Sequence, residues 1–162
     1  MADKRKDKLN AVFEDYLLTI YKLSKSKSSI TPGNIRKIIC TTRSNVSNTL
    51  KTLADRNYIQ HVPYGAISLT RKGRKHAKML YEKNLALQMF FKKVLDADDK
   101  EAFENACNIE HVLSDSLLLK LKLFFDFMEQ CPRNEPYFLA AFKHFCQTGE
   151  ICENCDQCAT SS

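Results

Sequence analysis

A polar helix followed directly by a short hairpin constrains the fold of this chain more than any other feature. The segment CTTRSNVSNTLKTLADRNYI places Val46, Leu50 and Leu53 at i, i+4 and i+7, which predicts a helix with one buried stripe. The next segment, YIQHVPYGAISLT, holds two short strand-like runs on either side of the turn residues PYG. The sequence therefore predicts a helix that leads into a two-stranded hairpin.

Other helices are predicted around this pair. LNAVFEDYLLTIYKLSKS has apolar residues at helical spacing, and Thr31 followed by Pro32 fits the start of a short second helix. Cys40, at the end of that second helix, is expected to be a small core residue. Thr70 opens a long helix with a dense basic first turn. This order of helix, helix, polar helix, hairpin and long helix is typical of a winged helix-turn-helix.

Charge divides the chain in two. Residues 1–83 carry 18 lysines and arginines against 6 acidic residues, a net charge of +12, whereas residues 84–162 carry −6. A basic half indicates a polyanionic partner. The polar helix also exposes short hydrogen-bonding side chains, which suit the major groove of double-stranded DNA, although a solvated amphipathic helix is the alternative. The expected DNA-binding residues are Thr42, Arg43, Ser44, Asn45, Ser47, Asn48 and Lys51.

The acidic half predicts a helical module. The long helix ends near LDADDKE, a second helix covers about residues 100–112, and Ser114 or Asp115 caps a third. The third helix is apolar at positions 117, 118, 121, 124, 125 and 128, a stripe that fits a homodimer interface or, alternatively, a monomeric helical core. The chain has no long apolar run, no secretion signal and no recognisable catalytic motif. We therefore expect a cytoplasmic protein that is neither an enzyme nor membrane-bound.

Several of these segments resemble one family. EDYLLTIYKLSKS, SNVSNTLKTLADRNYI, PYGAISLTRKGRKHA and especially ACNIEHVLSD are similar to the iron- and manganese-dependent repressors of the diphtheria-toxin-repressor and manganese-repressor family, over about residues 14–132. The resemblance implies a dimeric DNA-binding regulator activated by Fe²⁺ or Mn²⁺. It also implies that the metal joins the dimerisation helices to the first helix.

The resemblance carries four metal ligands onto this sequence. Cys107, Glu110 and His111 match the ligands of the second dimerisation-domain helix, and Asp15 stands where members place a Met or Asp. Thiolate and imidazole suit Fe²⁺, Zn²⁺ or Co²⁺, while carboxylates suit Mn²⁺ and Fe²⁺. The alternative for this motif is a buried Cys, a surface Glu and a His that is favoured by the helix C-terminus.

The sequence also departs from the family pattern. Asn84 and Gln88 stand where a second site draws a His and a Glu, Phe103 replaces a further His, and Leu18 replaces a Glu. The resemblance thus implies a single metal site. Gly65 stands where an Arg is common in the hairpin, which removes one expected phosphate contact.

The C-terminal tail is rich in cysteine. Five cysteines fall within 28 residues, and the last three form C-x2-C-x2-C. Four thiolates can hold an iron–sulfur cluster or a zinc ion, and a thiol-redox or disordered tail is the remaining alternative. The candidate ligands are Cys131, Cys146, Cys152, Cys155 and Cys158.

These observations together predict a mainly α fold with a small β-wing. The predicted parts are a winged helix-turn-helix DNA-binding domain at 1–72, a helical dimerisation and metal-sensing domain at 73–132, and a Cys-rich tail at 133–162. The predicted function is a metal- or redox-responsive repressor that binds palindromic operator DNA as a homodimer. The alternative function is an iron–sulfur or zinc protein whose winged helix mediates protein interaction.

Overall fold

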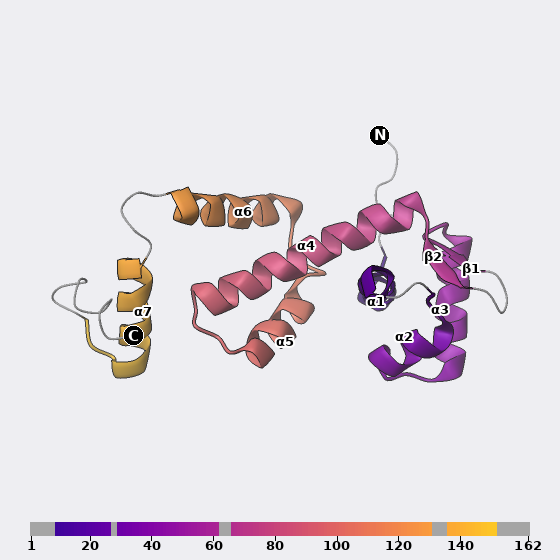
Figure 1. The fold of residues 1–162 in the computed structure, drawn as a ribbon, viewed down its shortest axis with the longest axis horizontal. Helices are drawn as coiled ribbons and strands as arrows, with labels where there is room; N and C mark the ends of the chain where they lie inside the picture. The colour runs from indigo at the N-terminus through magenta and orange to yellow at the C-terminus, as the bar shows by residue number, and fades with distance from the viewer. Residues whose placement is uncertain (1–8, 27–28, 62–65, 131–135, 152–162) are drawn as a thin grey trace. The chain divides into compact units, whose positions relative to one another are not determined.

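The chain divides into two compact units. The computed structural model describes residues 9–26, 29–61, 66–130 and 136–151, and Figure 1 shows the order of the elements. The N-terminal unit spans Met1–Glu82 and the C-terminal unit spans Lys83–Ser162. The division falls inside one unbroken helix, α4 (Arg71–Lys93).

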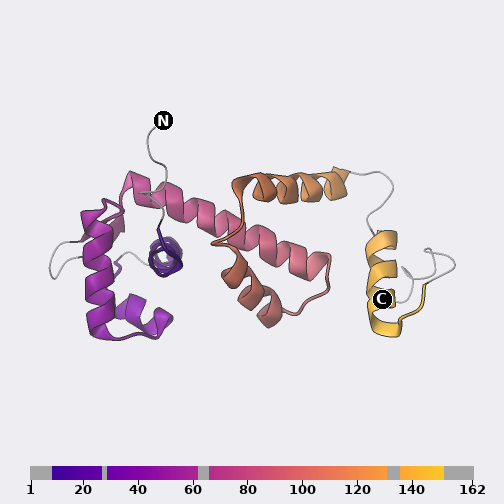
Figure 2. The same cartoon turned by 180° about the vertical axis from the view of Figure 1, so that it is seen from behind.

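The N-terminal unit is built around its first helix. Helices α1 (Ala11–Ser26), α2 (Pro32–Ile39) and α3 (Arg43–Asp55) precede strands β1 (Ile59–His61) and β2 (Ile67–Leu69). In Figures 1 and 2, α1 is seen nearly end-on among α2, α3 and the first part of α4. Residues 16–21 of α1 are all buried, so this helix packs on more than the one face that the apolar spacing predicted.

The start of α2 agrees with the sequence prediction. The Thr31 hydroxyl accepts a hydrogen bond from the backbone N–H of Asn34, and the Asn34 side chain accepts one from the backbone N–H of Thr31. This reciprocal capping box satisfies two N–H groups that have no partner inside the helix. Pro32, which has no N–H to satisfy, occupies the first helical position.

The end of α2 corrects one expectation. Cys40 is exposed and has a left-handed backbone, with φ of 52°, so it does not belong to the core. Its backbone N–H donates to the carbonyl of Arg36 and closes the last turn of the helix. A left-handed residue at this position is a common way to end a helix, and here it directs the chain into α3.

The hairpin, which we call the wing, is short and tied to the rest of the unit. β1 and β2 are antiparallel, with Ile59 opposite Leu69, and the backbone N–H of Ile67 donates to the carbonyl of Ile30 at 2.9 Å. The PYG turn lies in residues 62–65, outside the described residues. At the start of α4, a Cβ added to Gly73 would lie 1.9 Å from the carbonyl oxygen of Tyr58. Glycine therefore permits the helix to approach the wing.

Side-chain contacts fix the first part of α4 against α1. His76 Nε2 lies 3.0 Å from Glu14 Oε1, and both side chains are largely buried. Farther along, the rings of Tyr21 and Tyr81 pack with their centroids 5.5 Å apart, and the Lys25 ammonium lies 3.9 Å from the Tyr81 centroid. Polar and aromatic contacts thus hold α4 to α1 over several turns.

The C-terminal unit packs three helices around a small core. The second part of α4 lies with α5 (Asp99–Ile109) and α6 (Asp115–Gln130), as Figure 2 shows from behind. The core contains Leu87 of α4, Ala106 of α5 and Leu118 of α6. The Ser114 hydroxyl caps α6 by accepting from the backbone N–H of Leu117, which confirms the predicted start of this helix.

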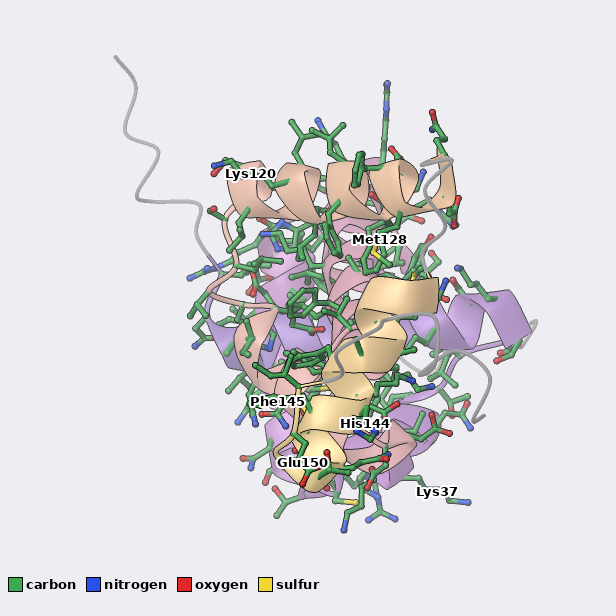
Figure 3. The ribbon with its side chains drawn as sticks, turned by 90° about the vertical axis from the view of Figure 1, so that its left-hand side faces the viewer. Lys37, Lys120, Met128, His144, Phe145 and Glu150 are labelled. Atoms are coloured by element: carbon green, nitrogen blue, oxygen red, sulfur yellow. The ribbon has the colours of Figure 1, made fainter. Side chains whose placement is uncertain are left out.

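A further helix, α7 (Pro136–Thr148), lies in the region that the sequence suggested was only a Cys-rich tail. Figure 3 labels His144 and Phe145 on this helix, and Phe145 is exposed. Pro136 at its first position is the start signal that could have predicted it. In the ranges that the structure describes, no helix combines the length and apolar character needed to cross a membrane. The mainly helical fold with a two-stranded wing is the fold class that the sequence predicted.

Candidate nucleic-acid interface and metal site

The predicted DNA-binding residues lie together on one face of α3. Val46, Leu50 and Leu53 are buried at 1% exposure or less, as their spacing predicted. The opposite side of the helix and its N-terminal cap carry seven exposed residues: Thr42, Arg43, Ser44, Asn45, Ser47, Asn48 and Lys51. The structure thus presents a continuous polar surface on a helix that is anchored by its apolar side.

Local contacts shape the N-terminal end of this face. The Thr42 hydroxyl caps α3 by accepting from the backbone N–H of Asn45, and it lies 3.1 Å from the hydroxyl of Ser44. The Asn45 amide donates to the hydroxyl of Thr41 at 3.2 Å. The N-terminal end of a helix carries a partial positive charge that favours an anionic group such as phosphate. Arg43 adds a full positive charge at the same end.

The first turns of α4 add more positive charge to the N-terminal unit. Arg71, Lys72, Arg74, Lys75 and Lys78 are all exposed. The Lys72 ammonium lies 4.3 Å from the Tyr58 ring centroid and donates to the carbonyl of Arg56 at 3.4 Å. The calculated charge excess of the first half is therefore displayed on the surface, as a polyanion-binding unit requires.

The predicted metal ligands of the C-terminal unit lie at the end of α5. Cys107 is on the last helical turn, Glu110 caps the helix, and His111 lies in the turn that follows. The helix ends at Ile109, so the prediction that one helix continues past His111 is wrong. Glu110 keeps a helical backbone, with φ −55° and ψ −33°, and its N–H donates to the carbonyl of Ala106.

The geometry and charge at this helix end suit a cation. Glu110 is 1% exposed, and its Oε1 lies 3.9 Å from His111 Nε2. The C-terminal end of a helix carries a partial negative charge, so a buried carboxylate there is costly unless positive charge compensates it. Carboxylate, imidazole and thiol are the donors that first-row transition metals use. The Glu110 carboxylate and the His111 imidazole therefore fit a divalent metal ion, whereas the Cys107 sulfur does not lie within 4.8 Å of both of these groups. Asp15, the fourth predicted ligand, lies exposed on α1 in the N-terminal unit.

Asn84 and Gln88 form a hydrogen-bonded chain in place of a second set of ligands. Asn84 is buried, its Nδ2 donates to Cys107 Sγ at 3.6 Å, and its Oδ1 accepts from Gln88 Nε2 at 2.5 Å. Sequence reasoning did not predict this chain. A signal was present, because Asn84 interrupts the apolar spacing of Leu80 and Leu87 and is therefore expected on the buried side of α4.

Helix α6 has more apolar side chains than the core of the C-terminal unit covers. Of the predicted stripe, Leu118 and Phe125 are buried and Leu121 packs against the core, so part of the stripe belongs to the unit itself. The exposed apolar residues of α6 are Leu117, Leu119, Leu123, Phe124 and Phe127. Five exposed large apolar side chains on one helix are typical of an interface.

Comparison with known proteins identifies both units. Residues 8–67 match the family described as "Iron dependent repressor, N-terminal DNA binding domain". Residues 70–139 match "Iron dependent repressor, metal binding and dimerisation domain". The two matches cover most of the chain and follow each other in the order of the two units. The chain belongs to the iron-dependent repressor family.

Relatives agree with this assignment of the family. An uncharacterised HTH-type transcriptional regulator of Methanocaldococcus jannaschii is 37% identical over 114 residues, which cover 70% of this chain and 91% of the relative. The HTH-type transcriptional regulator MntR of Bacillus pumilus is 25% identical over 137 residues, 85% of this chain and 94% of the relative. Members of the iron-dependent repressor family are transcriptional regulators, and the chain is not an enzyme.

Solved structures of the family share the fold. The manganese regulator SloR matches with a TM-score of 0.64 and 29% identity over 74% of this chain. A manganese-dependent transcriptional repressor in complex with manganese matches with a TM-score of 0.66 and 25% identity over 77% of this chain. This chain spans 56% of the length of each of these two proteins.

Proposed function

We propose that the chain is a metal-responsive transcriptional repressor that binds palindromic operator DNA as a homodimer. One divalent transition-metal ion, Fe²⁺ or Mn²⁺ in the simplest case, is held by Cys107, Glu110 and His111, with Asp15 as the fourth ligand. The observation that carries the proposal is the buried carboxylate of Glu110 at the C-terminal end of α5, 3.9 Å from the His111 imidazole. We place the repressor in the cytoplasm.

The proposed ligands determine how a bound metal ion would act on the protein. Glu110 supplies an oxygen, His111 an imidazole nitrogen and Cys107 a sulfur, and the bound cation offsets the negative charge that these groups and the helix end bring together. Asp15 belongs to α1, the central helix of the DNA-binding unit, so its ligation makes the conformation of that unit dependent on metal. A metal that binds one arrangement more tightly shifts the population towards it.

The DNA contacts follow from α3. Asn45 and Asn48 carry amides that can pair with adenine in the major groove, while Arg43 can pair with guanine or a phosphate. Thr42, Ser44, Ser47 and Lys51 complete the face with hydroxyls and one more positive charge. A homodimer reads two half-sites of opposite orientation, which is why the operator is expected to be palindromic. The exposed apolar residues of α6 supply the dimer interface.

The test is metal-dependent selection of DNA. Purified full-length protein is incubated anaerobically with a random duplex library in the presence of Fe²⁺ or Mn²⁺, and the enriched sequence is measured by fluorescence anisotropy with metal and with chelator. We expect an enriched inverted repeat whose affinity falls when metal is removed. Equal affinity with metal and with chelator would show that the regulator does not respond to metal.

Ligand variants test the site itself. Glu110→Gln and His111→Ala are expected to lower metal affinity by about tenfold or more, since removing only an outer partner of a ligand already costs about 10–100-fold. Glu104→Gln is the matched control, because Glu104 is exposed on the same helix. Equal metal affinity in Glu110→Gln and in the control would show that Glu110 is not a metal ligand.

We also propose a second metal centre at the tail cysteines, as an iron–sulfur cluster or a zinc ion. The support is the C-x2-C-x2-C spacing in the sequence. Cys146 lies exposed on α7, whereas Cys131, Cys152, Cys155 and Cys158 lie outside the described residues. Anaerobic analysis of metal and sulfide in the wild type and in Cys155→Ser tests the proposal, which fails if the two proteins hold the same metal.

A further inference from the structure

Asn84 is a buried polar side chain in the middle of α4, at 1% exposure. A buried amide is stable only when its donors and acceptor find partners. Its Nδ2 donates to the sulfur of Cys107 at 3.6 Å, and its Oδ1 accepts from Gln88 Nε2 at 2.5 Å. A directed chain of hydrogen bonds therefore runs along α4 from Gln88 to Asn84 and ends on the sulfur of α5.

Gln88 determines the direction of this chain. It lies four residues after Asn84, on the same face of the helix, where side chains at this spacing meet. Because the NH₂ group of Gln88 faces the oxygen of Asn84, the NH₂ group of Asn84 faces the sulfur. The Asn84 N–H is therefore directed at the sulfur of Cys107, which binds metal as the thiolate.

We infer that Asn84, oriented by Gln88, is a positioning residue that presents the Cys107 thiolate to the metal and sets the preference of the site for thiophilic ions. Fe²⁺, Zn²⁺ and Co²⁺ are thereby favoured over Mn²⁺. The inference rests on the proposed metal site and adds the residues that determine which ions this site prefers.

The effect has two physical causes. The hydrogen bond restricts the rotation of the Cys107 side chain before metal binds, so less conformational entropy is lost on binding. The donated N–H also stabilises negative charge on a half-buried sulfur. Mn²⁺ prefers oxygen ligands, so its affinity depends mainly on carboxylate and is less sensitive to the placement of the sulfur.

Co²⁺ is the probe, because a cobalt–thiolate bond gives a sulfur-to-metal charge-transfer band in the near ultraviolet. The full-length chain is used with its tail cysteines replaced, so that they do not contribute to the band. These replacements are Cys131→Ser, Cys146→Ser, Cys152→Ser, Cys155→Ser and Cys158→Ser. Each variant is then titrated with Co²⁺, Zn²⁺ and Mn²⁺, and Cys107→Ser confirms the origin of the band.

Asn84→Leu is the main variant and Gln88→Leu is the second. Asn84→Leu is expected to weaken the charge-transfer band and to lower Co²⁺ and Zn²⁺ affinity by about 10–100-fold, while Mn²⁺ affinity changes much less. Gln88→Leu leaves Asn84 in place and is expected to act in the same direction with a smaller effect. It also preserves the readout if Asn84→Leu does not fold.

Asn105→Leu is the matched control, because the Asn105 amide donates to the carbonyl of Glu101 on the exposed side of α5. A purely structural role for Asn84 would lower stability without changing the band or the ratio of Zn²⁺ to Mn²⁺ affinity. A band and a ratio equal to those of Asn105→Leu overturn the inference and leave the proposed function intact. A parent chain that binds Co²⁺ without the band excludes Cys107 as a ligand and overturns both.

Discussion

The ammonium of Lys83 donates to the backbone carbonyl of Leu113 over 2.6 Å. The same Nζ lies 3.0 Å from the carboxylate of Asp115, at the start of α6. The Lys83 side chain is only 8% exposed, so its charge is taken out of water to make these contacts. They close the turn that begins at Glu110, and α4 thereby fixes the segment that carries two of the proposed ligands.

Replacing Lys83 by Met tests this contact. The Met side chain has similar length but no donor, so the buried carbonyl of Leu113 loses its charged partner at a cost of about 1–3 kcal/mol. We expect Lys83→Met to lower the free energy of unfolding in urea by this amount and to weaken metal binding. Lys120→Met is the control, because Lys120 is exposed on α6 (Figure 3). Equal unfolding curves for the two variants would contradict the prediction.

Gly73 is expected to be intolerant of any side chain. In Gly73→Ala the new Cβ meets the carbonyl oxygen of Tyr58 at 1.9 Å, so α4 or the wing must move. Overpacking of this kind costs about 1–3 kcal/mol or more. Gly33→Ala is the matched change, because the nearest atom to its Cβ lies 3.7 Å away. The unfolding temperature of Gly73→Ala should be lower than that of Gly33→Ala. Equal unfolding temperatures would show that α4 or the wing can move to accommodate the new Cβ without loss of stability.

Charge removal on α3 is expected to change DNA binding without changing stability. Lys51 is exposed, so Lys51→Ala should unfold like the wild type. Loss of one phosphate contact should reduce the slope of log affinity against log salt by about 1. Binding titrations at several salt concentrations measure this slope. Lys93→Ala, at the end of α4, is the control and should keep the wild-type slope.

The exposed apolar face of α6 is expected to control oligomeric state. Leu123→Glu places a charge among Leu119 and Phe127, which lie one turn away on either side. A buried unpaired charge disfavours association, so we expect sedimentation analysis to show monomers where the wild type forms dimers. The neighbouring change Lys122→Glu is the control. A dimer that persists in Leu123→Glu places the interface elsewhere.

Local rules predicted the elements of the DNA-binding unit well. Thr31 with Pro32 marks the start of α2, and Val46, Leu50 and Leu53 lie on the buried side of α3 because short-range chemistry determines both. Cys40 shows the limit of such rules. Its residue type indicates burial, but Cys40 has a left-handed backbone where α2 ends and its side chain is exposed.

The metal-binding segment was harder to predict from sequence. Spacing alone places Cys107, Glu110 and His111 on one helical face, yet α5 ends before Glu110. Lys83 and Asn84 act on partners 30 and 23 residues away, and such pairings depend on how α4 packs against α5 and α6. No local pattern contains that information, and the resemblance supplied only the identities of the proposed ligands.

In α3 the residues that pack the helix and the residues that face the DNA are different, which determines how this regulator can acquire new target sequences. Its three buried apolar residues hold the helix, while the exposed residues after the Thr42 cap contribute little to that packing. Substitutions on the outer face can therefore alter the preferred DNA sequence at little cost in folding stability. The DNA sequence that this regulator prefers is therefore separable from the fold that presents α3.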